Sequence, residues 1–358
     1  MLLAFYSNWP TVLQIVLFLL AVVVGVFFLV KFSDIFVGAA SSIAKKLHIS
    51  PMIIGLTVVA MGTSLPELAV SASDSIDCLI HGGNANVAIG NVVGSNICNI
   101  LIVLGCSALF TSVFVPKSTL KKEFSILIAI TAILVLFGCT FNLGGSKAIL
   151  RWEGIILVIL MVAYIVFLVI DAIRHPQEEE VEVDENGNTV KKDDGIKDMN
   201  IWLAILLVIV GAAGVVLGGE MVVFGAKHFS LTCAEAAGVD NDLAESLVGL
   251  TVVAVGTSLP ELVTSVVASK KGQNEMALGN VIGSNIFNIL FVLGISATIN
   301  PLTTGNQIVF DLIVMALSTL LLFAVSFRGK LDRKIGIGFI LLYVCYVAYL
   351  IMRTMEVF

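Results

Sequence analysis

Long apolar stretches separated by short polar connections dominate the chain. The stretches lack the alternation of apolar and polar residues that strands of a membrane β-barrel show. A membrane-spanning helix needs about 20 residues, and ten stretches approach or exceed that length: 12–30, 52–73, 85–110, 124–139, 152–170, 201–224, 246–268, 276–298, 308–326 and 335–352. The pattern predicts an all-α membrane protein with ten transmembrane helices. The first helix is expected to continue past Asp34, because the following residues are still mostly apolar.

Composition agrees with this pattern. Apolar residues make up 58% of the 358 residues and charged residues only 13%, whereas about a quarter of a soluble globular chain is charged. The six cysteines are scattered without a Cys-x-x-Cys pair, so neither a disulfide framework nor a zinc site is expected. The sequence contains no nucleophile–base pair and no phosphate-binding loop. We therefore expect no enzyme, no cofactor, and no nucleic acid or protein partner.

Basic residues occur mainly in alternate connections between the predicted helices. With the N-terminus outside, sixteen of the 20 lysines and arginines lie in inner connections and four in outer ones, in agreement with the positive-inside rule. We therefore expect a multi-pass protein of the cell (inner) membrane with both termini outside and the loop 173–200 in the cytoplasm. That loop also carries most of the net charge of −6, so the acidity does not indicate a cationic partner.

Two segments of the chain occur twice. GLTVVAMGTSLPELAVS at 55–71 returns as GLTVVAVGTSLPELVTS at 249–265, identical at 14 of 17 positions. GNVVGSNICNILIVLG at 90–105 returns as GNVIGSNIFNILFVLG at 279–294, identical at 13 of 16 positions. Each copy falls at the same place in a set of five predicted helices, so the chain is expected to consist of two related halves.

The halves are residues 1–172 and 201–358, joined by the acidic loop 173–200. Because five is an odd number, the second half is expected to lie upside down in the membrane relative to the first. Inverted repeats with a binding site near the midplane are typical of secondary transporters.

A proline and a glutamate lie in each copy of the first repeated segment. Pro66 has no amide hydrogen, so the helix is expected to bend or break beside it. Ala60, Thr63, Ser64 and Glu67 fall on one helix face, and their hydroxyl, carboxylate and freed carbonyl oxygens are hard ligands that suit calcium or sodium. The second copy repeats this face with Ala254, Thr257, Ser258 and Glu261.

The second repeated segment places polar side chains on the next helices. Asn91, Ser95 and Asn99 share a face, and the other copy repeats it with Asn280, Ser284 and Asn288. Close helix packing is an alternative explanation for the Gly-x-x-x-Gly spacing in these segments. Packing does not explain a carboxylate in the middle of an apolar helix in each half, so we expect cation coordination.

The two glutamates, Glu67 and Glu261, lie in predicted helices that contain no basic residue. Unneutralised carboxylates at membrane depth are unfavourable. One divalent cation would neutralise the pair, and sodium ions with the surrounding oxygens could do the same. A proton on either carboxyl group is the competing explanation, and the residues alone leave these alternatives open.

The paired GTSLPEL and GNV-x-GSNI-x-NI segments resemble the alpha-repeats of the sodium/calcium exchanger family, within the calcium/cation antiporter superfamily. The resemblance covers nearly all ten predicted helices. It implies a secondary active antiporter that exchanges sodium for calcium by alternating access, with ions held between the second, third, seventh and eighth helices. If three sodium ions exchange for one calcium ion, as is usual in that family, transport is electrogenic.

The resemblance also implies roles for individual residues. The residues of a shared central calcium site would be Glu67, Thr63, Glu261 and Thr257. Oxygens for flanking sodium sites would come from Ala60, Ser64, Ser95, Ala254, Ser258 and Ser284, with Asn99 and Asn288 lining the middle. Potassium-dependent relatives carry Asp where this chain has Asn288, so we expect transport to be independent of potassium.

Two other functions share some of these features. A proton/calcium exchanger is the nearest alternative, but that branch typically carries a Gly-Asn-Ala-Ala-Glu segment where this chain has GTSLPE. A passive cation channel also uses helices with oxygen-lined breaks, but it would carry calcium without a counter-ion. Asp34 and Glu220 lie on the first helix of each half, where gating and solvation of a helix end both explain a carboxylate.

Overall fold

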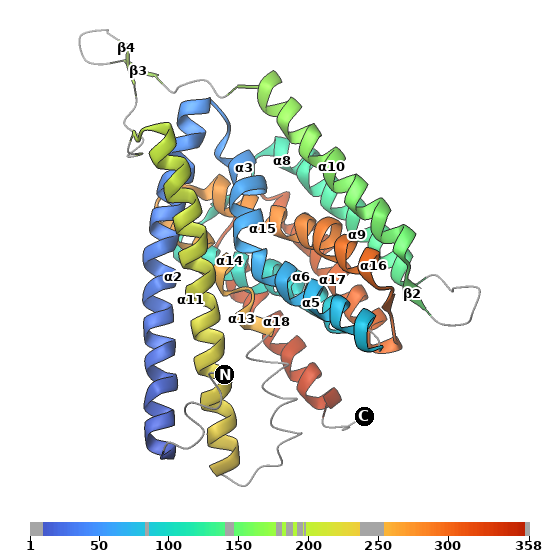
Figure 1. Cartoon of the computed structure of the whole chain (residues 1–358). Helices are drawn as coiled ribbons and strands as arrows, with labels where there is room; N and C mark the ends of the chain where they lie inside the picture. Colours follow the sequence, from blue (N-terminus) through green and yellow to red (C-terminus); the bar gives the residue numbers. More distant parts are fainter. Residues whose placement is uncertain are drawn as a thin grey trace.

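The computed structural model describes residues 10–82, 86–139, 147–176, 181–183, 189–191, 196, 198–236 and 254–354. Helices make up most of this part of the chain (Figure 1). The helices of the first half are α2 (Thr11–Leu47), α3 (Pro51–Ile54), α4 (Ala60–Thr63), α5 (Leu65–His81), α6 (Asn86–Cys98), α7 (Leu104–Phe110), α8 (Lys117–Lys121), α9 (Glu123–Cys139) and α10 (Arg151–Arg174). Those of the second half are α11 (Ile201–Ala236), α13 (Ala254–Gly256), α14 (Leu259–Lys270), α15 (Asn274–Phe287), α16 (Gly294–Ile299), α17 (Asn306–Ser326) and α18 (Arg333–Thr354).

In the described part of the chain, three π-helical segments continue these helices at their junctions. They are η1 (Gly55–Val59), η2 (Asn99–Val103) and η4 (Asn288–Leu293). In a π-helix the hydrogen bonds run from residue i to residue i+5, so each segment changes which residues face a given neighbour, and such segments are frequent at functional sites.

Eight helices within the described residues are long and apolar enough to cross a membrane, and the bent pair Pro51–Thr63 and Leu65–His81 would make nine. These nine coincide with nine of the ten predicted stretches, and α2 continues past Asp34 to Leu47 as predicted. The predicted stretch 246–268 is described only from Ala254 onward. The mostly helical membrane fold is therefore confirmed, and the number ten stays a prediction.

The two longest helices, α2 and α11, lie side by side along their lengths and form a layer at the left of Figure 1. Glycines allow the two backbones to approach closely. A Cβ atom added at Gly218 of α11 would lie 2.7 Å from the amide nitrogen of Leu29 and 2.9 Å from the carbonyl oxygen of Gly25, both on α2. Contacts this short require the backbones to move apart.

Helix α15 lies in the interior of the remaining helices, and every residue from Met276 to Phe287 is buried. It packs against α3, η1, α4 and α14. A Cβ atom added at Gly279 would lie 2.5 Å from the carbonyl oxygen of Met52. Close packing therefore accounts for this glycine of the repeated segment, as the Gly-x-x-x-Gly spacing suggests, while the polar residues of the segment need another explanation.

The structure contains short antiparallel strand pairs, which the prediction of helices did not include. Two of the pairs connect distant parts of the chain. Strand β1 (Val113–Phe114) pairs with β6 (Lys330–Leu331), and β2 (Ala148–Ile149) pairs with β5 (Leu302–Thr303). A third pair, β3 (Val181–Val183) with β4 (Thr189–Lys191), lies in the acidic loop. Two- and three-residue strands carry no detectable periodicity in the sequence, so they could not be predicted from it, and they leave the mostly helical fold unchanged.

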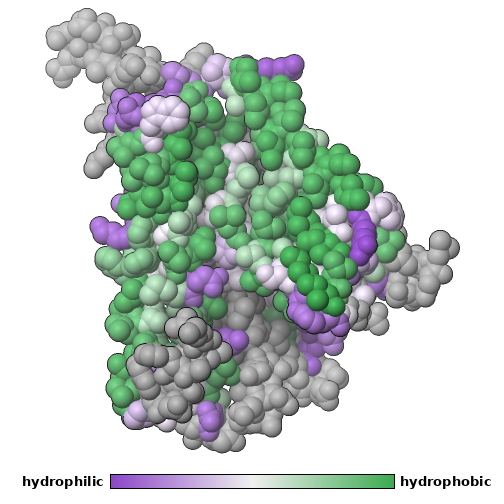
Figure 2. All heavy atoms as spheres, viewed as in Figure 1, coloured by the Kyte–Doolittle hydropathy of each residue, from purple (hydrophilic) through white to green (hydrophobic). Residues whose placement is uncertain are grey.

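Hydrophobic side chains cover much of the exterior visible in Figure 2, over α2, α11 and α10. Large exposed apolar residues on these helices include Leu20, Phe27, Ile159, Val162 and Ile209. An exterior of this kind is far more apolar than that of a soluble monomer and fits contact with lipid chains.

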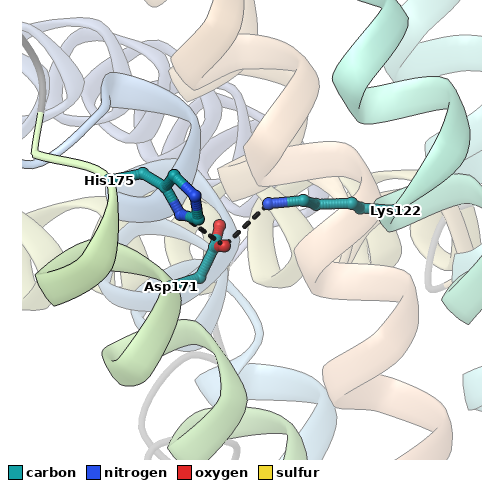
Figure 3. Close-up of polar contacts among 3 residues, drawn as sticks. All are labelled: Lys122, Asp171 and His175. Carbon is teal, nitrogen blue, oxygen red and sulfur yellow. Dashed lines mark hydrogen bonds and ion pairs between the residues drawn. The ribbon is translucent and has the colours of Figure 1, made fainter.

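The last turns of α2 and α10 and the first turn of α11 lie at the top of the view in Figure 1, and charged side chains connect these helix ends to neighbouring segments. Asp171 near the end of α10 accepts hydrogen bonds from Lys122, at 2.7 Å, and from His175, at 3.1 Å (Figure 3). Lys46 at the end of α2 lies 2.9 Å from Asp198, just before α11, and this contact lowers the pKa of the Asp198 carboxyl group. These pairs lie beyond the apolar parts of the helices they connect.

The close packing of α2 and α11 makes a prediction about stability. Gly218→Ala introduces a methyl group into a backbone contact and is expected to destabilise the protein by about 1–3 kcal/mol. Gly338→Ala on α18 is the matched control, because its added Cβ would meet no described atom within 4 Å. Thermal unfolding in detergent, followed by loss of the monodisperse chromatography peak, should show a lower midpoint for Gly218→Ala only. Equal midpoints would contradict the packing.

Candidate ion-binding site

The GTSLPE segment interrupts a helix in both halves. Helix α4 ends at Thr63 and α5 begins at Leu65, and the axes on either side of the interruption differ by 48°. Ser64 between them has φ −88° and ψ 10°, and Ser258 at the same place in the second half has φ −85° and ψ 2°. The predicted break beside the proline is confirmed in the first half and is matched by the backbone of the second.

Glu67 and Glu261 lie in the first turn of the helix that follows each break. Both side chains are fully buried. The first turn of a helix carries amide N–H groups without helical partners, which favours a negative charge there. The break therefore gives each buried carboxylate a favourable position that an uninterrupted helix would not provide.

One oxygen of each carboxylate accepts hydrogen bonds from serines. Glu261 Oε1 accepts from Ser64 Oγ of the other half at 2.9 Å and from Ser284 Oγ at 3.4 Å. Glu67 Oε1 accepts from Ser95 Oγ at 3.4 Å. The second oxygen, Oε2, of each glutamate is buried and has no hydrogen-bond partner among the described residues.

The threonines of the two breaks also reach the other half. Thr63 Oγ1 lies 3.2 Å from Asn280 Oδ1, and Thr257 Oγ1 lies 3.4 Å from Ser95 Oγ. The predicted residue Ala60 begins α4, and its carbonyl oxygen accepts from the Ser64 amide at 3.1 Å. Ala254 begins α13. The carbonyl of Ala60 is therefore used within its own helix in this structure.

Four asparagines form two reciprocal pairs between the halves. Asn99 Nδ2 donates to Asn285 Oδ1, and Asn288 Nδ2 donates to Asn96 Oδ1, both at 3.2 Å. The Oδ1 atoms of Asn99 and Asn288 are buried and have no partner among the described residues. Asn99 and Asn288 are also the first residues of η2 and η4.

The prediction from sequence included Asn99 and Asn288 but missed their partners, Asn96 and Asn285. Both partners are almost fully buried. Each is the asparagine of a repeated Gly-Ser-Asn sequence, so the repeat carries the signal that identifies them. Asn91 and Asn280 bond to the backbone of the two glutamates. Their side-chain amides donate to the backbone oxygens of Glu67, at 3.3 Å, and Glu261, at 3.5 Å.

Five buried oxygens of the predicted site residues therefore have no donor among the described residues: Glu67 Oε2, Glu261 Oε2, Asn99 Oδ1, Asn288 Oδ1 and Ser258 Oγ. Leaving buried acceptors without a partner is unfavourable, and for a carboxylate it is more so. All five are hard oxygen ligands of the kind that bind calcium and sodium. The arrangement can satisfy these oxygens by holding a cation between the halves.

Comparison with known proteins agrees with this chemistry. The family described as "Sodium/calcium exchanger protein" matches residues 17–170 and 203–352. The chain is 34% identical to the sodium/calcium exchanger MaX1 of Methanosarcina acetivorans, over 92% of this chain and 97% of that protein. It is 35% identical over 281 residues to the inner membrane protein YrbG of Escherichia coli, covering 78% and 79%.

Solved structures of the sodium-calcium exchanger NCX_Mj have the same fold. With NCX_Mj soaked in 10 mM Na⁺ and 10 mM Sr²⁺, the TM-score is 0.74 and the identity 31%, over 93% of this chain and 98% of that one. The family model thus matches most of the chain, and a relative of nearly equal length and solved structures with the same fold agree with it. The chain belongs to the sodium/calcium exchanger family.

Proposed function

We propose that this protein is a secondary antiporter that exchanges sodium ions for calcium across the membrane by alternating access. The observation that carries the proposal is the pair of fully buried glutamates, one from each half. Each has one oxygen that accepts from serine hydroxyl groups and one without a partner among the described residues. A pair of this kind needs positive charge, and the spans that carry it contain no basic residue. A transported cation supplies that charge.

The charge balance favours an exchange of calcium for sodium. Two carboxylates carry about two negative charges, which one calcium ion neutralises. Several sodium ions can do the same with the help of neutral oxygens. The Ala60 carbonyl accepts the Ser64 amide but has a second lone pair for an ion. The proposed neutral oxygens are the side chains of Thr63, Thr257, Ser64, Ser258, Ser95, Ser284, Asn99 and Asn288 and the carbonyls of Ala60 and Ala254. With three sodium ions the site would hold one net positive charge, so the exchange would be electrogenic.

The proposed architecture is ten transmembrane helices in two inverted five-helix halves, 1–172 and 201–358. The contacts support it, because equivalent elements exchange partners between the halves. Helix α10 packs against α16, as α18 packs against α7. Strand β1 pairs with β6 as β5 pairs with β2. The family match also stops at residue 170 and resumes at 203, on either side of the loop 173–200.

The proposed location is the cell membrane, with both termini outside and the loop 173–200 in the cytoplasm. The distribution of lysine and arginine favours this orientation. In Figure 1 the first turn of α2 and the last turn of α18 lie at the bottom of the view, and β3 and β4 of the loop lie at the top. The first turn of α2 and the last turn of α18 thus lie on the side opposite β3 and β4.

A flux measurement in the absence of potassium tests the function. Proteoliposomes loaded with sodium are diluted into sodium-free choline buffer containing radioactive calcium. We expect calcium uptake that requires internal sodium and increases when an ionophore allows compensating charge movement, with no effect of adding potassium as a substrate. Uptake driven by a pH gradient without sodium would instead indicate a proton/calcium exchanger, and uptake without any counter-ion a passive channel.

Replacing the paired carboxylates tests the site. Glu67→Gln and Glu261→Gln each remove one charge from the cluster while preserving shape, and the lost ion contact is expected to lower sodium-driven calcium uptake about 10- to 100-fold. Glu123→Gln is the matched control, because Glu123 is also buried but bonds to Tyr164 on α10. Its uptake is expected to stay within about twofold of wild type. Full activity of either site variant would refute the assignment.

A further inference from the structure

The repeat makes it possible to compare the two sides of the molecule. Helix α2 is equivalent to α11, and α5 is equivalent to α14. The contact between α2 and α14 should therefore have a counterpart between α11 and α5. The structure differs between these two places: α2 and α14 are joined by an ion pair, whereas a cavity lies between α11 and α5.

Helices α2 and α14 are in close contact. Ser33 Oγ of α2 lies 3.1 Å from Thr264 Oγ1 of α14, and both side chains are buried. Lys271, directly after α14, reaches back to α2 and places its Nζ 2.8 Å from Asp34 Oδ1 and 2.7 Å from the Asp34 backbone oxygen. The ammonium group thus bonds to the side chain and the backbone of one residue.

The equivalent place between α11 and α5 is open. A cavity of about 460 Å³ lies there, and its wall includes Leu65 and Pro66, directly before Glu67. Val216 and Glu220 of α11 form the opposite wall. Glu220, which corresponds to Asp34, has no ion-pair partner among the described residues.

The sequences explain why only one side has an ion pair. Extending the repeat by its offset of 194 residues aligns Lys271 with Asp77. The α11–α5 side therefore has two acidic residues, Glu220 and Asp77, where the α2–α14 side has the attractive pair Asp34 and Lys271. Attraction favours closure between α2 and α14. Asp77 contacts His81 of its own helix, at 2.9 Å, and offers Glu220 no positive charge across the α11–α5 side.

We propose that the Asp34–Lys271 ion pair is a latch that keeps the α2–α14 side closed while the cavity between α11 and α5 is open, and that it must break when access to the ions changes sides. In the proposed orientation the latch is on the cytoplasmic side. The latch rests on the proposed alternating access, but it can be tested without measuring transport.

The size of the effect follows from exposure. The side chains of Lys271 and Asp34 are 34% and 55% exposed, and partly exposed ion pairs contribute little individually. Breaking the pair is therefore expected to shift the balance of the two access states by about two- to fivefold. A shift of this size is measurable as a change in the accessibility of the cavity.

Labelling of a cysteine in the cavity measures that balance. Ser73→Cys, on the α5 wall, is placed in a background with Cys78, Cys233 and Cys345 changed to serine, and its reaction with a membrane-impermeant maleimide is timed in proteoliposomes. Lys271→Gln and, independently, Asp34→Asn should lower the labelling rate about two- to fivefold. The charge exchange Asp34→Lys with Lys271→Asp should restore most of it.

Lys270→Gln is the matched control, because this neighbouring lysine lies over the Phe110 ring and has no contact with Asp34 in the structure. Its labelling rate should equal that of the unmutated background. Unchanged labelling in both Lys271→Gln and Asp34→Asn, an equal fall in Lys270→Gln, or a charge exchange that labels like Lys271→Gln would each overturn the latch. Failure of sodium-driven calcium flux in the wild type would refute the proposed function and leave this test unaffected.

Discussion

The structure depends on holding two negative charges, those of Glu67 and Glu261, inside a largely apolar helix bundle. Each carboxylate is placed at the beginning of a helix, where amide groups stabilise it, and each is half satisfied by serine hydroxyls. That leaves buried negative charge that positive charge would stabilise. In the proposed exchange cycle an empty site would be unfavourable in either access state, so one set of ions would replace another. Under that proposal the site favours exchange over one-way flow.

Neither half holds a complete set of these contacts. Ser64 of the first half bonds to Glu261 of the second, and the asparagines pair reciprocally between halves. Because these hydrogen bonds cross the interface, a movement of one half relative to the other would change the geometry of the proposed ion site. In the proposed cycle, coupling between ion occupancy and helix movement would arise from these same contacts.

The sequence predicted the helix breaks and the polar faces around them, because proline and the repeat are strong local signals. It did not predict the role of Asn96 and Asn285, because they lie off the face shared by Asn91, Ser95 and Asn99, and only the packing of the halves brings them to the site. The π-helical segments depend on tertiary contacts and leave no periodic signal. The ion pair of Asp34 was also not predicted, because it depends on the packing of α2 against the end of α14, although the alignment of Lys271 with Asp77 carries a signal for the asymmetry.

The strand pairs have a consequence for biosynthesis. Strand β1 follows the third predicted helix, whereas its partner β6 is made only after α17. While the intervening helices are synthesised and inserted, the backbone N–H and C=O groups of β1 have no strand partner, and unpaired strand edges are prone to wrong pairing. The last two helices, α17 and α18, therefore complete the folding of the first half as well as the second. A truncation before β6 would leave an early part of the chain unfinished.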